Sequence, residues 1–347
     1  MITKGKMGNV LMLFLASLIL INPLAVINAV KGALFVCYES VIPSLYPIMV
    51  FSNYLSSDYF IKFFSLPFQW YARLMKIEDN RYPGYLAISL FGGFAVAATF
   101  IARLKKAGYE QNAVNCISIS MINNSFSFCV LAVGAIYIGN AVIGLQIYLA
   151  LICSSLITAF ILSFIKQYNI VMPTGYCIES NISFVEAIKK AIDSILSICG
   201  FVIIFNVICE VLLLYAYNNK YLSVFIPVLS EVTVGCLKTV ELLGKNPYFI
   251  VIILSFLPIC TLCQVYYFTL DPYIIKALIY SRLLHIPLSL IIYSLISNIF
   301  PVSHMTAIFE NAVMKSYSYN AELSFTLFLI TIVFLKIFNS NKLFTNS

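Results

Sequence analysis

The sequence has 347 residues, of which 61% are hydrophobic and only 10% charged, and its mean hydropathy is +0.96. Soluble domains carry about 25% charged residues, so this composition excludes a soluble protein and predicts an all-α polytopic integral membrane protein. The net charge of +7 does not indicate a nucleic-acid partner, because Lys and Arg in a membrane protein mostly lie in loops and set its orientation.

The N-terminal region predicts one transmembrane helix. Lys4 and Lys6 precede the apolar run Val10–Val30, which has the length of about 20 residues that a bilayer requires. A signal peptide is the alternative, but no small-residue cleavage pattern closes the run. We therefore expect a retained helix with its N-terminus in the cytoplasm.

The next two segments point to a bent helix and an interfacial stretch. Ala33–Leu55 contains Pro43 and Pro47, and because proline removes a backbone donor and kinks a helix, we expect a bent helix beside a cavity. Glu39 is interpreted as a carboxylate near the interface rather than a coupling group, since buried membrane carboxylates are rare. Phe60–Lys76 mixes aromatic and basic residues, which is typical of an interfacial segment.

Two adjacent segments are then interrupted. Tyr85–Leu104 is short for a single span and contains Gly92-Gly93, so we expect a helical hairpin with the glycine pair at its tip. Ala113–Ile138 is broken at Asn123-Asn124-Ser125. Broken backbone at membrane depth is tolerated where protein or a water-filled cavity surrounds it. The two interruptions therefore predict a transport site.

The second half of the chain has a similar pattern. Ser183-x-x-Glu186 is a capping box that predicts a helix start, and an amphipathic stretch leads from it into an apolar span. Val224–Leu243 and Phe249–Leu270 follow, and they are interrupted by Pro227, Glu231, Thr233, Gly235, Pro258, Thr261 and Gln264. Paired broken segments in two halves predict an inverted-repeat, transporter-like core with re-entrant hairpins and broken helices.

The sequence lacks the marks of an enzyme or a metalloprotein. The ten cysteines lie almost all in apolar runs, where a free cysteine behaves as a small hydrophobic side chain. Cys260 and Cys263 form a C-x-x-C pair, but no βαβ pattern or second ligand pair accompanies it. We therefore expect no cofactor, no metal and no catalytic residue.

Several motifs in chain order carry a family resemblance: VIPSLYPIMVFSNYL, GGFAVAATFIARLKKAGYEQ, INNSFSFCVLAVGAIYIG, FVEAIKKAIDSILSICGFVIIF, LSEVTVGC, LSFLPICTLCQV and YSRLLHIPLSLIIYSLI. Together they resemble the sporulation integral membrane proteins of the YlbJ type. These belong to the nucleoside-recognition, or gate-domain, group and are similar to concentrative nucleoside transporters. The resemblance covers Ala33 to Pro301.

The resemblance implies a transporter-like protein of spore formation that moves dipicolinic acid, or a similar small aromatic anion, across the outer forespore membrane into the developing spore. The expected partners are a small anionic substrate and the lipid bilayer, with a homo-oligomer left open. The chain departs from the family at Phe94–Ala97, Phe126-Ser127 and Leu257-Pro258, where the family has Gly or Pro. Fewer glycines restrict unwound backbone, so the alternatives are a non-transporting structural or assembly protein of sporulation and a nucleoside-type transporter.

The expected organisation has four parts and about nine or ten membrane-embedded segments, as judged from hydropathy lengths. They are an N-terminal transmembrane helix (residues 1–32), a first gate-like repeat (33–170), a second gate-like repeat beginning with an amphipathic helix (171–301), and a loop with a C-terminal transmembrane helix (302–347). The last part comprises the polar loop Pro301–Asn320 and the span Leu323–Phe338.

Dipicolinate is a planar dianion, and half-helix N-termini and polar side chains supply the donors that it needs. The residues expected to bind it are Asn123, Asn124, Ser125, Ser127, Glu231, Thr233, Thr261 and Gln264. The alternative for the Asn-Asn-Ser break is a hydrogen-bond cluster that only holds helices together.

Arg282 and His285 share one helix face. One hypothesis makes them an anion relay or a counter-charge for Glu231. The other makes them a structural ion pair or an arginine that extends to the interface.

Overall fold

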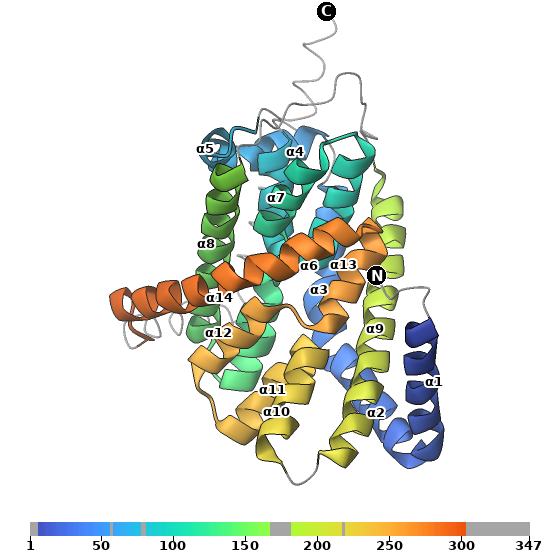
Figure 1. Cartoon of the computed structure of the whole chain (residues 1–347). Coiled ribbons are helices and arrows are strands. Elements are labelled where there is room, and N and C mark those ends of the chain that lie inside the picture. Colours follow the sequence, from blue (N-terminus) through green and yellow to red (C-terminus); the bar gives the residue numbers. More distant parts are fainter. Residues whose placement is uncertain (1–5, 56–57, 78–80, 167–181, 217–218, 303–347) are drawn as a thin grey trace, which may run out of the picture. The chain divides into compact units, whose positions relative to one another are not determined.

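The computed structural model describes residues 6–55, 58–77, 81–166, 182–216 and 219–302, and every element in these ranges is a helix (Figure 1). Five helices are long and apolar enough to cross a membrane, or up to six if a bent pair counts as one span. The prediction of an all-α integral membrane protein is therefore confirmed. These are full spans among the described residues only, whereas the nine or ten membrane-embedded segments expected include re-entrant ones, so that number stays a prediction. The predicted loop Pro301–Asn320, apart from its first two residues, and the last span Leu323–Phe338 lie outside the described residues.

The N-terminal region contains two helices instead of the single helix predicted. α1 (Lys6–Ile21) and α2 (Pro23–Val36) are separated at Asn22, and the chain bends there by 99°. Pro23 has no N–H to continue the ladder of α1. The Asn22 side chain donates to the Leu18 carbonyl at 2.9 Å, which satisfies one carbonyl at the end of α1.

The segment predicted to be a bent helix contains a π-helical turn, and the segment predicted to be interfacial forms short helices, whose location relative to the bilayer stays a prediction. A single π-helical turn, η1 (Cys37–Val41), joins α2 to α3 (Ile42–Tyr54), and Pro47 lies inside α3. Three short helices then follow: α4 (Asp58–Ser65), η2 (Leu66–Phe68) and α5 (Gln69–Leu74). Glu39 in η1 and Trp70 in α5 are both exposed.

α6 (Tyr82–Lys106) folds back on itself at Gly93. The backbone of Gly93 has φ 76° and ψ −169°, which no helix contains. The rings of Tyr85 and Phe100 stack with their centroids 4.5 Å apart, whereas 15 residues of continuous helix would separate them by about 22 Å. The predicted helical hairpin with the glycine pair at its tip is therefore the structure of this segment. Although α6 has the length and hydropathy of a span, it is not a single straight helix.

The segment after this hairpin is a broken helix. α7 (Gln111–Met121) ends at Ile122, and η3 (Phe128–Ile138), a π-helix, begins beyond the Asn-Asn-Ser break. α8 (Ala141–Lys166) then returns and packs against both α7 and η3.

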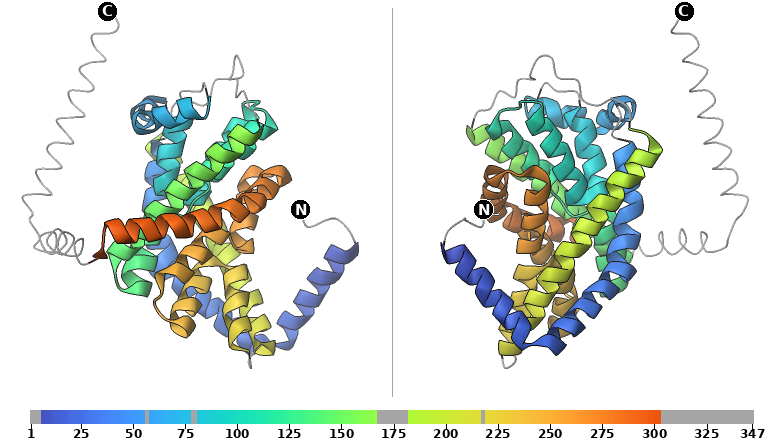
Figure 2. Two further views of the ribbon diagram at one scale, coloured as in Figure 1. Left: turned by 60° about the vertical axis from the view of Figure 1, so that its left-hand side comes forward. Right: turned by 90° about the vertical axis from the view of Figure 1, so that its right-hand side faces the viewer.

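α9 (Phe184–Tyr215) is a continuous helix of 32 residues. The Ser183 hydroxyl accepts a hydrogen bond from the Glu186 N–H at 3.2 Å, so the predicted helix start is confirmed. α9 contacts α2, α3, α10 and α13 and so links the N-terminal helices to the second half of the chain (Figure 2).

A second hairpin consists of α10 (Lys220–Ser230) and α11 (Val232–Leu243), with Glu231 at its tip. Glu231 is extended, with φ −150° and ψ 137°. The two arms pack closely, because a Cβ atom on Gly235 would lie only 2.9 Å from the Val228 Cα atom.

The last described segment is again a broken helix followed by a long one. α12 (Pro247–Phe256) and α13 (Ile259–Thr269) are halves of one apolar segment. Leu257 has φ 60° and ends α12, and Pro258 has no N–H to continue it. α14 (Pro272–Ile299) crosses α8 and packs on it, as well as on α7 and α12 (Figure 1, Figure 2).

Candidate functional site

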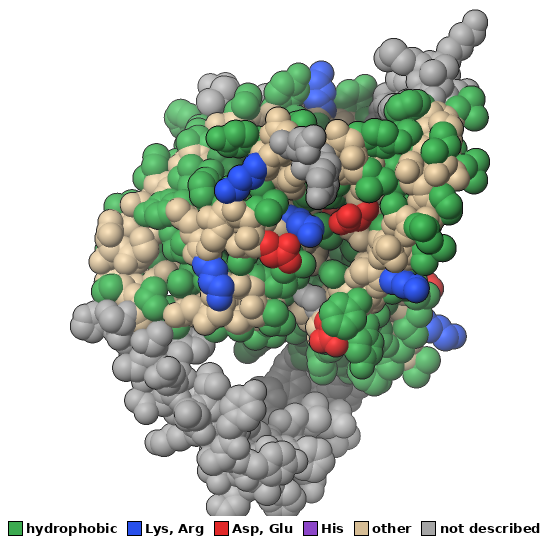
Figure 3. All heavy atoms as spheres, turned by 90° about the horizontal axis from the view of Figure 1, so that it is seen from below, with side chains coloured by type: hydrophobic (Ala, Val, Ile, Leu, Met, Phe, Trp, Pro, Cys, Tyr) green, Lys and Arg blue, Asp and Glu red, His purple; other side chains and the backbone are tan. Residues whose placement is uncertain are grey.

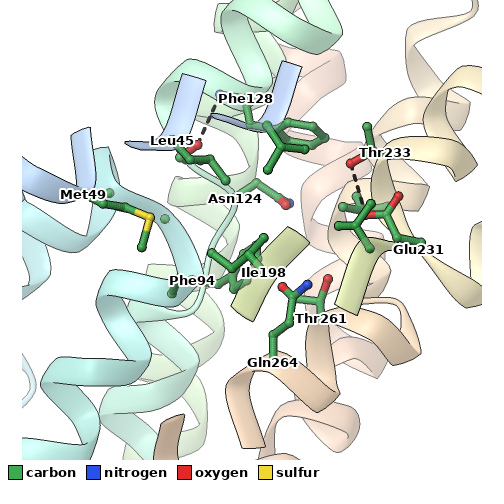
Figure 4. A pocket seen from close by; sticks show the side chains of 17 residues that line it. Leu45, Met49, Phe94, Asn124, Phe128, Ile198, Glu231, Thr233, Thr261 and Gln264 are labelled. Carbon is green, nitrogen blue, oxygen red and sulfur yellow. Dashed lines mark hydrogen bonds between the residues drawn. The ribbon is translucent and has the colours of Figure 1, made fainter. Parts of the chain in front are cut away.

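A small cavity lies where the four interrupted segments meet (Figure 4). Its volume is about 30 Å³, which is room for roughly two water molecules. Six of the eight residues predicted to bind substrate line it, together with both glycines of the first hairpin tip. These residues are Gly92, Gly93, Asn124, Ser125, Glu231, Thr233, Thr261 and Gln264.

The break after α7 lies directly against the tip of the first hairpin. A Cβ atom on Gly93 would lie 2.9 Å from the Ser125 Cβ atom and 3.0 Å from the Ser125 nitrogen. The Ser125 hydroxyl accepts from the Phe128 N–H at 3.2 Å and so begins the helix that follows. Only glycine fits at position 93, both because of this contact and because of its backbone angles.

Asn124 connects the two halves of the chain. Its side-chain nitrogen donates to the Leu254 carbonyl at 2.9 Å, across 130 positions of sequence. Leu254 is in the last turn of α12, where carbonyl groups have no partner within the helix. Asn124 therefore caps one broken helix from the break in the other, while its side chain also lines the cavity.

Glu231 lies at the tip of the second hairpin, with 3% of its surface exposed. One carboxylate oxygen accepts from the Val234 N–H at 2.8 Å, and the other accepts from the Thr233 hydroxyl at 3.1 Å. The carboxylate thus caps the N-terminus of α11, where the helix dipole favours negative charge. It is the one charged side chain among the residues that line the cavity.

Gln264 on α13 points into the space between Asn124 and Glu231 (Figure 4). It is 2% exposed, and its nitrogen donates weakly to the Cys260 sulfur at 3.3 Å. Its carbonyl oxygen has no hydrogen-bond partner among the described residues. Since buried acceptors are nearly always satisfied, this oxygen is suited to receive a hydrogen bond from a solute or a water molecule.

Asn123 and Ser127 do not line the cavity. The Asn123 side chain donates to the Ser120 carbonyl and to the Ser155 hydroxyl, both at 2.9 Å. The Ser127 hydroxyl donates to the Ser44 carbonyl at 2.7 Å. These two residues hold α7 to α8 and η3 to α3, which is the helix-joining role that the sequence left as an alternative.

Arg282 and His285 form a polar cluster at the end of α12. Arg282 Nη1 lies 3.0 Å from His285 Nδ1 and 3.3 Å from the Ser255 carbonyl oxygen. Because guanidinium only donates, Nδ1 accepts and the proton is on Nε2, which donates to the Leu151 carbonyl at 3.3 Å. The positive charge thus lies at a helix C-terminus, which its dipole favours.

The structure does not support the hypotheses that give Arg282 a carboxylate as its charge partner. Arg282 forms no ion pair within the described part of the chain, so neither a counter-charge for Glu231 nor a structural ion pair is observed. Arg282 is 5% exposed, so its guanidinium group lies inside the protein. The sequence alone left an ion pair open. The acceptor for Arg282 is a backbone carbonyl of α12, and that carbonyl is free only because the helix breaks at Leu257.

The apolar wall of the cavity was not predicted from the sequence. It consists of Val41, Leu45, Met49, Ala95, Phe94, Phe128, Ile198, Val202 and Val232. The paired prolines of the second apolar run predicted that this helix lies beside a cavity, and Leu45 and Met49 of α3 confirm it. No pattern in α9 distinguished Ile198 from its neighbours.

Comparisons with protein-family models, curated proteins and solved structures found no match for this chain. The family resemblance of the ordered motifs therefore remains a prediction, and the function is argued from the cavity and the elements around it.

Proposed function

We propose that this protein is a transporter of spore formation that carries dipicolinate, or a similar small aromatic anion, across the outer forespore membrane into the developing spore. The observation that carries the proposal is the cavity, whose polar lining comes from the tips and breaks of interrupted helices and, at Gln264, from the second turn after a break. Such breaks mark solute sites in transporters built from repeats.

An inverted repeat is part of the proposal and is supported by the order and contacts of the elements. In each half a hairpin precedes a broken helix and then a long helix: α6, α7–η3 and α8 in the first, α10–α11, α12–α13 and α14 in the second. The first hairpin contacts α13 and the second contacts η3; likewise α14 contacts α7, and α8 contacts α12. These reciprocal contacts are what a two-fold relation between halves requires.

The charge of the cavity restricts the form of the substrate. Glu231 supplies a carboxylate, and none of the described residues that line the cavity is basic, so a bare dianion would be repelled. A divalent cation held between the two carboxylates of dipicolinate makes the complex neutral. We therefore propose that the substrate enters as this neutral complex, and that the lining moves apart to admit it, because the present cavity holds only water-sized molecules.

A nucleoside-type solute is a second candidate, favoured by one observation. The Glu231 carboxylate and the unpartnered Gln264 carbonyl oxygen are both acceptors, and a neutral solute with several hydroxyl groups would donate to them without any cation.

Uptake into proteoliposomes containing the purified full-length protein tests these functions. Labelled dipicolinate should accumulate faster than in protein-free vesicles, and only when a divalent cation such as Ca²⁺ is present. Uptake of uridine instead, independent of Ca²⁺, would favour the second candidate. No uptake of either solute by folded protein would contradict transport and favour a structural role in sporulation.

A further inference from the structure

An apolar groove lies on the second hairpin and is separate from the central cavity, since no residue lines both. Its walls are α10, α11 and α12, and its volume is about 530 Å³. Val228, Thr239 and Ile253 form its floor, and the latter two are buried. Its rim includes the exposed side chains of Tyr221, Phe225 and Phe249.

The floor contains a hydroxyl group that the protein leaves unsatisfied. Thr239 is 1% exposed, and its oxygen has no hydrogen-bond partner among the described residues. A threonine inside a helix usually donates to the carbonyl one turn earlier. An acceptor in the groove would satisfy this hydroxyl, whereas a purely hydrocarbon occupant would not.

One end of the groove is basic. Lys220 lines it, is exposed, and forms no ion pair within the described ranges. Lys238, on the other arm of the hairpin, is paired with Glu241 at 3.3 Å, and the Lys245 ammonium lies against Gly139, so Lys220 is the basic residue that lines this end. Basic and acidic side chains are both scattered among hydrophobic ones on the lower face of the molecule (Figure 3). An anionic group is favoured at this end.

The register of the hairpin sets the spacing between the two polar features. Because Gly235 packs against Val228, Thr239 lies level with Val224, one helical turn along α10 from Lys220. Four residues of α-helix rise about 6 Å. The groove therefore has Lys220 at its charged end and, about one turn further along, the Thr239 hydroxyl, which can donate to an uncharged acceptor. Apolar side chains line the groove beyond Thr239.

We propose that the groove binds one anionic phospholipid from the surrounding bilayer, with its phosphate at Lys220, an ester carbonyl at Thr239 and an acyl chain along Phe225, Val228 and Ile253. The three parts of the groove match the charged, ester and hydrocarbon parts of the lipid in that order. Val228 is one turn from the hairpin tip, so the lipid supports the arm that holds Glu231 in the cavity.

Native mass spectrometry of the full-length protein, titrated with phosphatidylglycerol and phosphatidylcholine of identical acyl chains, tests the preference for a headgroup with net negative charge. Phosphatidylglycerol should bind about fivefold more tightly, since one lysine near an anionic headgroup contributes about 1 kcal/mol. Lys220→Gln should remove this preference. Lys276→Gln, an exposed lysine on α14 beside Tyr280, is the matched control and should retain it. Equal binding of both lipids to the wild type would overturn the proposal.

Two further variants test the groove itself. Val228→Phe should fill the apolar part and weaken binding of both lipids, whereas Ile279→Phe, on an exposed position of α14, should not. Thr239→Val keeps the side-chain volume but removes the hydroxyl, and should weaken both lipids by roughly threefold. Unchanged lipid binding in both groove variants, or a peptide of defined mass bound in place of lipid, would contradict the proposal.

Discussion

Asn123 and Asn124 are adjacent in the chain but point to different neighbours. Asn123 joins α7 to α8, whereas Asn124 reaches the end of α12 and lines the cavity. The pair therefore offers the same chemical change at two positions, of which only one contacts the proposed site.

Asn124→Leu should weaken substrate binding by about tenfold to a hundredfold, because losing a hydrogen bond to a carboxylate group of the substrate complex costs about 1.5–3 kcal/mol. Asn123→Leu should lower the melting temperature through its two lost hydrogen bonds but leave the affinity of folded protein close to the wild type. Equilibrium binding and thermal melting of both variants provide the comparison. Equal loss of affinity in both would show that Asn124 acts only through helix packing.

Glu231 combines a structural and an electrostatic role, and a single substitution separates them. Glu231→Gln keeps an oxygen that can accept from the Val234 N–H, so we expect a stability loss of about 1 kcal/mol or less. Removal of the carboxylate charge should increase binding of free dipicolinate and reduce its dependence on a divalent cation. Isothermal titration with and without Ca²⁺ measures the affinity for free dipicolinate and its dependence on the cation, and thermal melting measures the stability. Loss of all binding by a folded variant would instead favour a solute that donates directly to Glu231.

At the scale of elements, the hairpins are stabilised by close contact at their tips. Gly93 combines a backbone conformation that only glycine adopts readily with direct contact to Ser125. The first hairpin and the first broken helix are thus held in one arrangement by a single residue.

Gly93→Ala should lower the free energy of unfolding by about 1–3 kcal/mol from backbone strain, and more from the clash with Ser125. Gly200→Ala is the matched control: Gly200 is exposed within α9, and a Cβ atom there would meet nothing within 4 Å. Since alanine is the better helix former, the control should be as stable as the wild type or more so. Thermal melting in detergent gives both values, and an unchanged Gly93→Ala protein would rule out the strained tip.

At the scale of the whole molecule, one ion pair joins the two halves outside the cavity. Lys105, near the end of α6, lies 2.6 Å from Asp271, which precedes α14 and has a side chain only 1% exposed. Although burial opposes ionisation, hydrogen bonds from Lys105, the Tyr273 N–H and Gln111 lower the pKa of Asp271 below its ordinary value.

This pair predicts a loss of stability in acid. Because the pKa of Asp271 is lower in the folded state, ionised Asp271 adds to the free energy of unfolding. This contribution is present above the unfolded pKa of about 3.9 and is lost as the pH falls through the folded pKa. The wild-type melting temperature should therefore fall below about pH 4, and Asp271→Asn should show a smaller fall. Glu241→Gln, in the exposed pair with Lys238, should retain the wild-type pH dependence. Parallel melting curves for the wild type and Asp271→Asn would contradict this role.

Much of the fold follows from local sequence. Membrane helices are specified by hydropathy along a single segment, and the breaks at Gly93, Asn124 and Pro258 are visible because Gly, Asn and Pro disfavour the helix interior. The bend at Asn22 was missed because a continuous apolar run dominated the prediction, although the lone Pro23 was its signal.

Tertiary structure alone decided which polar residues meet. Both Asn123 and Asn124 interrupt the same run, and only the packing of α12 against that break places one in the cavity and the other between helices. Likewise, Arg282 donates to the Ser255 carbonyl rather than to Glu231, because the break at Leu257 frees that carbonyl at the point where α14 passes. The sequence determines where a helix can end. Which group then satisfies its unpaired backbone depends on segments more than a hundred residues away, as the bond between Asn124 and Leu254 illustrates.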